Sequence, residues 1–303
     1  MPNCVRERQN SEDALRLLRA RARIHAGVKR AQRYYFIFVF LLPVVSIVTT
    51  STPCLSGGTK WVSLVALMVG ASDALWIDRW RRGRIKLSAR LQEQFDTTVL
   101  DLPWNAFVAG HRVDAEEVER YGSKPLMAAR ESELRDWYPQ SVDPLPMSSA
   151  RLVCQRTNLW YDSNLRDDYQ RCLKALGWLY LAVLIVISLQ KPLVDVILTM
   201  LVPFGPFALW IIRESQRQGD TIALVARLKG EVDGSLDKFQ PNDDAVKLEA
   251  RARQLQDAIF SHRASSPLVS DLVYFFRREK LEQEMQAGAK DFIKRLNAGN
   301  SLK

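Results

Sequence analysis

YYFIFVFLLPVVSIVTT at residues 34–50 holds no charged side chain, and it decides how the rest of the chain is interpreted. Three more apolar runs follow: WVSLVALMVGASDALWI at 61–77, ALGWLYLAVLIVISLQ at 175–190 and LVDVILTMLVPFGPFALWII at 193–212. A helix needs about 17–25 mostly apolar residues to cross the hydrocarbon core of a membrane. Each run is close to that length, so the sequence predicts four membrane spans. The alternative for each run is a buried core helix of a soluble domain.

The four runs form two pairs with short connections. Ser, Thr, Gly and Pro fill much of the gap at 51–60, and the second gap is only Lys191-Pro192. These connections predict two transmembrane hairpins, at 34–78 and at 175–212. A mean hydropathy of -0.15 conceals the spans because long polar regions dilute them. We therefore expect an all-α membrane protein with helical cytosolic regions.

Lysine and arginine are concentrated on one side of the predicted spans. They cluster before the first span, after the second, before the third and after the fourth, whereas the two hairpin connections hold only Lys60 and Lys191. The positive-inside rule then places both termini and the middle region 79–174 in the cytoplasm. The net charge of +9 could also indicate nucleic-acid binding. Because the basic clusters adjoin the spans, we expect the lipid bilayer and not DNA or RNA as the partner.

The N-terminal region 1–33 is charged and amphipathic, and it lacks the short apolar core of a cleavable signal peptide. Its leucines fall among arginines at helical spacing. This pattern is typical of a helix that lies on the inner surface of the membrane. The alternative is a helix that packs on the cytosolic part of the protein.

The two other cytosolic regions, 79–174 and 213–303, also have helical patterns and no alternating β-branched runs. The predicted helices in the first region extend from the second span to Pro103, from Glu131 to Trp137, and from about Ser148 into the third span. The predicted helices in the second region end near Phe239, His262 and Leu296, with a turn at Gln240–Asp244 and a break at Ser265–Pro267.

Familiar catalytic and metal-binding motifs are absent from the sequence. Cys4, Cys54, Cys154 and Cys172 have no metal-like spacing, and no HExxH, GxSxG, Walker loop or GxGxxG occurs. We therefore expect a protein that is not an enzyme and that needs no metal or cofactor.

The segment QRTNLWYDSNLR at 155–166 holds side chains suited to an anionic nucleotide. Its arginines offer donors to phosphate, its aromatic rings offer stacking surfaces, and its Asn and Asp could contact a base edge or ribose. The candidate ligand-binding residues are Arg156, Asn158, Trp160, Tyr161, Asp162 and Arg166. The alternative is a structural Arg–Asp and aromatic network that anchors the helix entering the third span. A weaker second group consists of Arg263, Arg277 and Arg278.

Polar and helix-breaking residues inside the spans are candidates for a pore or gate. A carboxylate within a span is costly and usually faces protein or water, so Asp73 could line a pore. Alternatively, the second span ends earlier and Asp73 lies at the headgroups beside Arg79. Pro203, Gly205 and Pro206 could form the hinge of a gate, or simply kink a helix whose neighbours satisfy the freed backbone groups.

Four segments carry a resemblance to a known family: LQEQFDTTVLDLPWN (91–105), DWYPQSVDPLP (136–146), QRTNLWYDSNLR (155–166) and LQDAIFSHRASSPLVSDLVYFFRREKLEQEM (255–285). The chain resembles the SMODS-associating four-transmembrane effectors, predicted pore-formers of bacterial anti-phage systems that use cyclic-oligonucleotide second messengers. The resemblance covers nearly the whole chain. It departs at Val269-Ser270-Asp271-Leu272, where the family leads us to expect a Pro-Asp-Trp-like element.

The resemblance implies an immune effector and supplies no catalytic residue. A partner synthase would make a cyclic oligonucleotide, and the effector would bind it, assemble as a homo-oligomer and breach the inner membrane. The alternative from another class is a membrane-tethered signalling scaffold, or a subunit of a membrane enzyme, whose spans act only as anchors.

Overall fold

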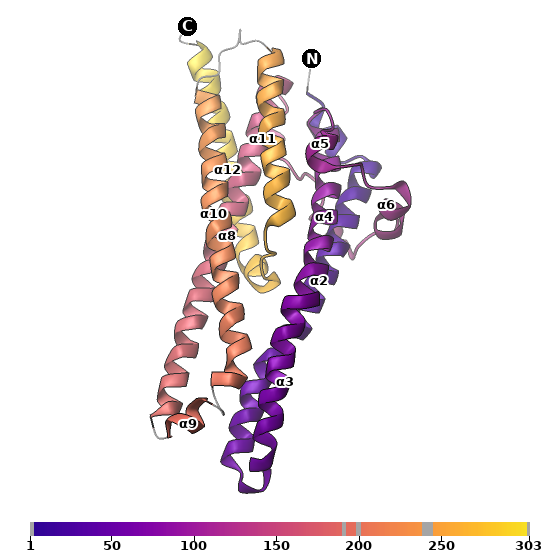
Figure 1. Ribbon diagram of the computed structural model, residues 1–303. Helices are drawn as coiled ribbons and strands as arrows, with labels where there is room; N and C mark the ends of the chain where they lie inside the picture. Colours follow the sequence, from indigo (N-terminus) through magenta and orange to yellow (C-terminus); the bar gives the residue numbers. More distant parts are fainter. Residues whose placement is uncertain (1–2, 190–191, 198–200, 238–244, 302–303) are drawn as a thin grey trace.

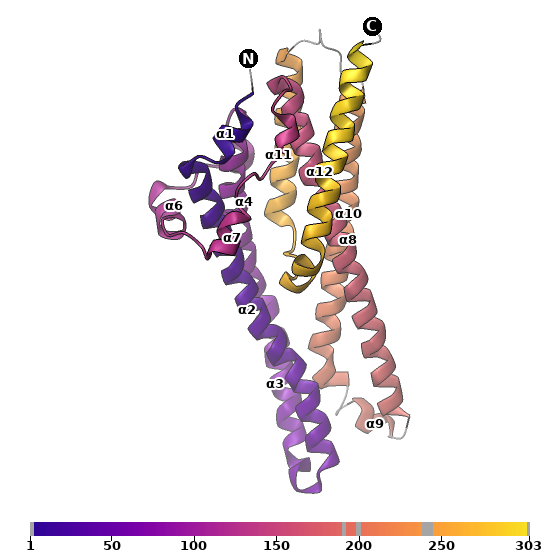
Figure 2. The same ribbon diagram turned by 180° about the vertical axis from the view of Figure 1, so that it is seen from behind.

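The computed structural model describes residues 3–189, 192–197, 201–237 and 245–301, and over those ranges it contains helices and no strands (Figure 1). The predicted all-α fold is therefore confirmed. Two long helical arms lie side by side at one end of the molecule and separate toward the other (Figures 1 and 2). Each arm carries one of the two predicted hairpins.

The first arm is a hairpin of two long helices. Its outgoing helix is capped by Ser11, whose side chain accepts a hydrogen bond from the backbone N–H of Ala14. A short 3-10 turn, η1, connects it to a return helix that a single π-helical turn, η2, interrupts. The elements are α2 (Glu12–Ser51), η1 (Pro53–Gly58), α3 (Thr59–Ser72), η2 (Asp73–Ile77) and α4 (Asp78–Val99).

The second arm contains the second hairpin and the C-terminal helices. Its first helix is 42 residues long and starts at Met147, next to the predicted start at about Ser148. The C-terminal helices pack against the half of it that precedes the predicted span (Figure 2). The elements are α8 (Met147–Ser188), α9 (Leu193–Val196), α10 (Val202–Asp237), α11 (Ala245–Ser265) and α12 (Asp271–Ser301). The turn predicted at Gln240–Asp244 lies outside the described residues.

Short elements surround the ends of the arms that lie away from the predicted spans: α1 (Val5–Gln9), α5 (Ala106–Ala109), α6 (Ala115–Gly122), α7 (Ala128–Ser132) and η3 (Gln140–Val142). The helix predicted at Glu131–Trp137 is wrong in its bounds, because α7 ends at Ser132. Asp136 takes a left-handed backbone conformation with φ of 50°, and its N–H donates to the Asn10 side chain over 3.1 Å. A contact with a distant part of the chain therefore replaces the end of the predicted helix.

The half of α2 that precedes the predicted span is part of the main hydrophobic core. Leu15, Leu18 and Ile24 are buried in one cluster with Leu91 and Phe95 of α4. A helix lying on a membrane surface would turn these leucines toward lipid. In the structure, therefore, the helix of the N-terminal region packs on the rest of the protein, which is the second of the two alternatives for this region.

Within the described residues, three helices are long and apolar enough to cross a membrane, at Glu12–Thr49, Lys60–Val99 and Met147–Val186. In their most apolar windows only 22%, 24% and 11% of residues are buried inside the protein, so most of their side chains are free to contact lipid. The predicted span 61–77 falls within the second of these ranges, and the predicted spans 34–50 and 175–190 overlap the first and third except for residue 50 and residues 187–190.

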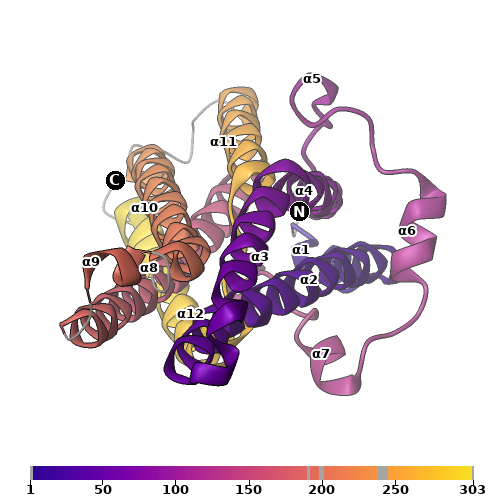
Figure 3. The same ribbon diagram turned by 60° about the horizontal axis from the view of Figure 1, so that its bottom comes forward.

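The fourth predicted span, 193–212, is divided between α9 and the first residues of α10, and residues 198–200 between them lie outside the described part. Four spans therefore remain a prediction from the sequence. When the bottom of Figure 1 is turned forward, the second hairpin lies next to the first, with α10 between α8 and α3 (Figure 3).

Candidate functional site

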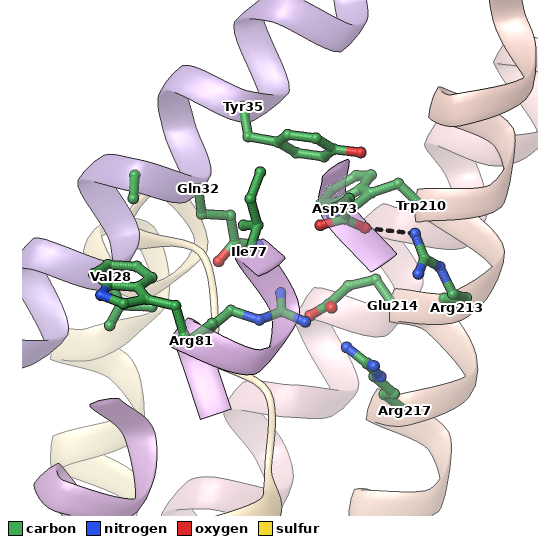
Figure 4. Close-up of a pocket in the computed structure, with 12 residues that line it drawn as sticks. Val28, Gln32, Tyr35, Asp73, Ile77, Arg81, Trp210, Arg213, Glu214 and Arg217 are labelled. Carbon is green, nitrogen blue, oxygen red and sulfur yellow. Dashed lines mark hydrogen bonds and ion pairs between the residues drawn. The ribbon is translucent and has the colours of Figure 1, made fainter. Parts of the chain in front are cut away.

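Charged side chains from both arms meet where the predicted spans end and the helices continue into the rest of the protein (Figure 4). Asp73, the first residue of the π-helical turn, is buried, and its Oδ2 lies 2.7 Å from a guanidinium nitrogen of Arg213 on α10. The pair joins the second predicted span to the end of the fourth. A π-helical turn inside an α-helix often marks a functional position. We call this pair and its surroundings the boundary site.

A second ion pair lies about one turn further from the predicted spans. Asp78 accepts hydrogen bonds from Arg81 on its own helix, over 2.6 Å, and from Arg217 on α10, over 3.1 Å. Burial alone would raise the pKa of Asp78, but the hydrogen bonds from Arg217 and Arg81 outweigh it and hold this pKa below its usual value. The carboxylate is therefore charged at neutral pH and joins the two arms electrostatically.

The boundary site encloses a cavity of about 20 Å³, which is room for one or two water molecules. The hydroxyl of Tyr35 is buried there without a hydrogen-bond partner. Glu214 is also buried and is bonded to the Gln218 amide over 3.0 Å; burial raises the pKa of this carboxyl group above its usual value. The space is too small for a nucleotide, so the geometry is that of a polar junction between the arms.

The proline-containing segment of the fourth predicted span forms the start of α10. Pro203 is the second residue of α10, where the backbone N–H would have no partner within the helix, whereas Pro206 lies inside the helix and removes one of its backbone hydrogen bonds. Pro206 packs against Gly70 of α3, and the Tyr180 hydroxyl donates to the carbonyl oxygen of Phe204 over 2.7 Å. This segment therefore contacts both α3 and α8. Gly205 lies between the two prolines, and a Cβ atom added there would meet open space.

The six candidate ligand residues on α8 do not share one face. Arg156 points toward α10 and α12: its Nε lies 2.5 Å from Asp233, and its guanidinium stacks over the Phe292 ring at 4.7 Å. Trp160 and Tyr161 are half-buried and pack in a cluster with residues of α12. These contacts are of the kind expected for a structural Arg–Asp and aromatic network that anchors the helix entering the third span.

Asn158, Asp162 and Arg166 occupy another face of α8. Asn158 donates to the Tyr138 hydroxyl over 3.3 Å. Arg166 contacts Asp162 at 2.8 Å, and Asp162 lies 2.8 Å from the His262 ring of α11. Burial alone would raise the pKa of Asp162, but the neighbouring Arg166 and the His262 hydrogen bond hold this pKa well below its usual range.

The second group of arginines is fully engaged with carboxylates. Arg263 binds Asp96, Arg277 binds Asp168 over 2.5 Å, and Arg278 binds Glu282 over 2.6 Å and also Glu133. These three residues come from α11 and α12 and do not form one site.

Sequence reasoning missed two basic residues on the first arm, Arg21 and His25. The Arg21 guanidinium lies 5.0 Å from the centre of the Trp137 ring, and in the described part of the chain no carboxylate is within ion-pairing distance of it. Burial and the nearby Arg263 lower the pKa of Arg21 to about 10. The sequence contained one weak indication of their position, because Arg21 and His25 lie close along the chain to the leucines of α2 that are buried.

His25 lies close enough to Arg21 and to Arg166 of α8 to feel the charges of both. Burial, and then the charges of Arg21, Lys29 and Arg166, hold the pKa of His25 well below its ordinary value. The imidazole is therefore neutral at pH 7. We call Arg21, His25, Trp137, Asp162 and Arg166 the inter-arm cluster.

Two polar groups in and beside the inter-arm cluster are buried without partners. The indole N–H of Trp137 and the hydroxyl of Tyr161 have no hydrogen-bond acceptor or donor in the described structure. Buried groups of this kind cost free energy unless a ligand or water satisfies them. An unpaired guanidinium, two unsatisfied donors and aromatic rings together suit a phosphate-bearing ligand with bases.

A wider groove of about 730 Å³ lies between α2, α4 and α6. Its ionisable lining residues are Asp13, Arg16, Glu116, Glu119 and Arg120. Because carboxylates outnumber guanidinium groups, this groove would repel an anionic ligand. The inter-arm cluster is the better candidate for the binding of an anion.

Comparison with known proteins agrees with the sequence motifs and the helical arms. The profile of the family described as SMODS-associating 4TM effector domain matches residues 3–292. A protein of Bacillus cereus (strain VD146) named "Probable CBASS effector molecule" is 22% identical over 288 residues, which cover 92% of this chain and 95% of that protein. No solved structure matches the chain. Because the family profile spans nearly all of its length, the chain belongs to the SMODS-associating four-transmembrane effector family, the membrane effectors of cyclic-oligonucleotide anti-phage defence.

Proposed function

We propose that the protein is a pore-forming effector of the bacterial inner membrane, and that a cyclic oligonucleotide made by a partner synthase triggers it. The observation that carries the proposal is the pair Asp73–Arg213, which joins the two hairpins at 2.7 Å where the spans end. α2, α8 and α10 each continue from a predicted span into the cytosolic bundle. A change in the bundle therefore has a direct route to the hairpins.

One copy of the chain has too few spans to enclose a wide lumen. The most apolar windows of its long helices leave most residues unburied, and one chain offers only two hairpins. An aqueous pore therefore requires several copies around a common axis. We expect the active state to be a homo-oligomer with both termini in the cytoplasm.

The inter-arm cluster is the proposed trigger site, together with the flanking candidates Arg156, Asn158, Trp160 and Tyr161 on α8. Arg21 would pair with a phosphate, and the unsatisfied donors of Trp137 and Tyr161 would bind the ligand's oxygen or nitrogen atoms. A cyclic oligonucleotide carries phosphates and bases at a short spacing. This spacing suits the cations and aromatic rings of the proposed site.

A ligand can open the pore only if it binds the open or assembled state more tightly than the resting state. The inter-arm cluster takes residues from α2, from α8 and from the segment that precedes η3, so a ligand between them would change the spacing of the two arms. In this scheme the ion pairs of the boundary site hold the resting state. Asp73 and the Pro203–Pro206 segment then act as gate elements.

The decisive experiment is release of a small dye from liposomes that hold the purified protein, with and without a panel of cyclic di- and trinucleotides. We expect little release without nucleotide and rapid release with one of the panel. Cells should tolerate expression alone and lose membrane potential when the matching synthase is active. Binding of a nucleotide without any release would exclude a pore and would favour the membrane-tethered scaffold.

The trigger site is tested by replacing Arg21 with methionine. This variant should lose nucleotide binding by a factor of ten or more, because it removes the one unpaired guanidinium of the cluster. The exposed Arg30 on the same helix provides the matched control, and its methionine variant should bind normally. Unchanged binding by the Arg21 variant would move the site elsewhere, and Arg156→Ala and Trp160→Ala would then be examined.

A further inference from the structure

The start of α12 carries an exposed apolar surface outside the predicted spans. Leu272, Phe275 and Phe276 are 67%, 76% and 72% exposed. The other strongly exposed apolar residues of the described cytosolic regions, such as Phe107, Met127 and Val246, are isolated from one another in the sequence. We call the group of three the α12 tip.

The three residues of the α12 tip share one face of the helix, because they follow the spacing i, i+3, i+4. The opposite face packs on the protein: Val273 and Tyr274 join the cluster that contains the buried Leu281. One turn later the outer face becomes charged, with Glu279 and Lys280 exposed. The apolar surface therefore covers a single turn.

Ion pairs fix the α12 tip at the level where the first span begins. Asp271 lies 2.6 Å from Lys29 and 3.6 Å from Arg33 of α2. Arg33 directly precedes Tyr34, the first residue of that span. The tip therefore lies where α2 enters the membrane.

A second contact fixes the same helix against the other arm. Arg277 lies 2.5 Å from Asp168 of α8, about two turns before the third span begins at Ala175. Figure 2 shows the lower end of α12 beside α8 at about half the height of the molecule, above the hairpins. Both arms thus place the α12 tip at the membrane surface on the side of the cytosolic bundle.

The charge around the α12 tip suits a membrane with anionic lipids. Arg33 and Arg171 are 66% and 72% exposed at their side chains, and Arg30 is exposed as well. Basic side chains near the bilayer surface are attracted to anionic headgroups. Aromatic and leucine side chains on one face of a helix enter the boundary between headgroups and acyl chains.

We propose that the α12 tip inserts into the membrane leaflet that faces the cytosolic bundle, with Leu272, Phe275 and Phe276 among the acyl chains. The occupant of this surface is lipid, because the surface continues the lipid-facing side of α2, where Tyr34 and Phe38 are exposed. The C-terminal helix is then attached to the bilayer independently of the spans. This inference does not depend on whether the protein forms a pore.

The test is collision of a nitroxide spin label with oxygen, which concentrates in lipid, and with a water-soluble nickel complex. Cysteine is introduced at position 276, and separately at 272, in the full-length protein with Cys4, Cys54 and Cys172 replaced by serine. The labelled proteins are placed in vesicles of phosphatidylcholine and phosphatidylglycerol. Cysteine at 107 is the matched control, since Phe107 is 98% exposed on α5, far from the spans (Figure 1).

We expect labels at 276 and 272 to collide at least three times more often with oxygen than with the nickel complex, and the label at 107 to show the reverse order. Labels at 276 and 272 that behave like the label at 107 would overturn the proposal. Exclusion of both reagents, with spin–spin broadening that disappears on dilution with unlabelled protein, would also overturn it and would assign the surface to a second copy of the chain.

Discussion

We predict that replacing Arg213 has a larger effect on the protein than replacing Asp73, its partner in the ion pair of the boundary site. The side chain of Asp73 is 11% exposed and that of Arg213 is 40% exposed. Arg213→Met leaves a buried carboxylate without its cation, whereas Asp73→Asn leaves a guanidinium that water or headgroups can reach. A buried charge that loses its partner costs about 3–5 kcal/mol, and a surface pair is worth about 0–1 kcal/mol.

The cavity beside Asp73 holds room for one or two waters, so the cost for Arg213→Met is reduced to about 2 kcal/mol. If the pair exists only in the resting state, this value shifts the equilibrium toward the open state by a factor of roughly 30. Asp73→Asn costs about 0.5–1 kcal/mol and shifts the equilibrium roughly 2–5-fold. The double variant should resemble Asp73→Asn, because the carboxylate that Arg213→Met would leave unpaired is then absent.

The assay is dye release from proteoliposomes without any nucleotide, with thermal unfolding in detergent as the measure of stability. Arg213→Met should leak most, the double variant and Asp73→Asn less, and the native protein least. A leak from Asp73→Asn that equals or exceeds that of Arg213→Met would refute the reasoning, as would a double variant whose effect is the sum of the two. Arg82→Met, which removes a largely exposed partner of Asp78, is the control and should not leak.

Three further predictions concern stability, measured by thermal unfolding in detergent. Glu214→Gln should stabilise the protein at pH 7.5, because burial raises the pKa of the Glu214 carboxyl group in the folded protein above 4.5. The neutral carboxyl group therefore contributes stability below pH 4.5, and this stability is lost as the pH rises through the folded-state pKa. The advantage of glutamine over glutamate should accordingly shrink toward pH 4.5. Gly122→Ala should destabilise by about 2–3 kcal/mol, because its Cβ would lie 2.5 Å from the carbonyl oxygen of Arg16, whereas Gly83→Ala meets nothing within 4 Å and should be neutral or stabilising. Ser11→Ala should cost about 1 kcal/mol through the lost cap of α2; an unchanged midpoint would mean that water replaces the cap.

The sequence was sufficient for features that depend on neighbouring residues. Apolar runs predicted the three long helices, because hydrophobicity and length are local properties of a segment. The start of α8 and the break after α11 followed from proline and serine at 144–148 and 265–267. The family could be identified from motifs of the same local kind.

Contacts between the arms could not be predicted in this way. The partner of Asp73 is Arg213, 140 residues away, and the nearer Arg79 looked equally suitable. Arg21 resembled the other arginines of the N-terminal region until the packing of α2 beside Trp137 isolated it from carboxylates. These pairings depend on how two helical hairpins pack, and a single sequence holds no direct record of that packing.

The length of α8 has a mechanical consequence. The helix runs for 42 residues, about 60 Å, without an internal proline. Such a helix behaves as a stiff lever: a tilt of about 5° about its N-terminal end moves its C-terminal end by roughly 5 Å. A displacement of that size at the hairpin requires no helix to unfold and no core residue to change its neighbours. Distances between labels at opposite ends of the molecule would detect it, whereas circular dichroism would register no change.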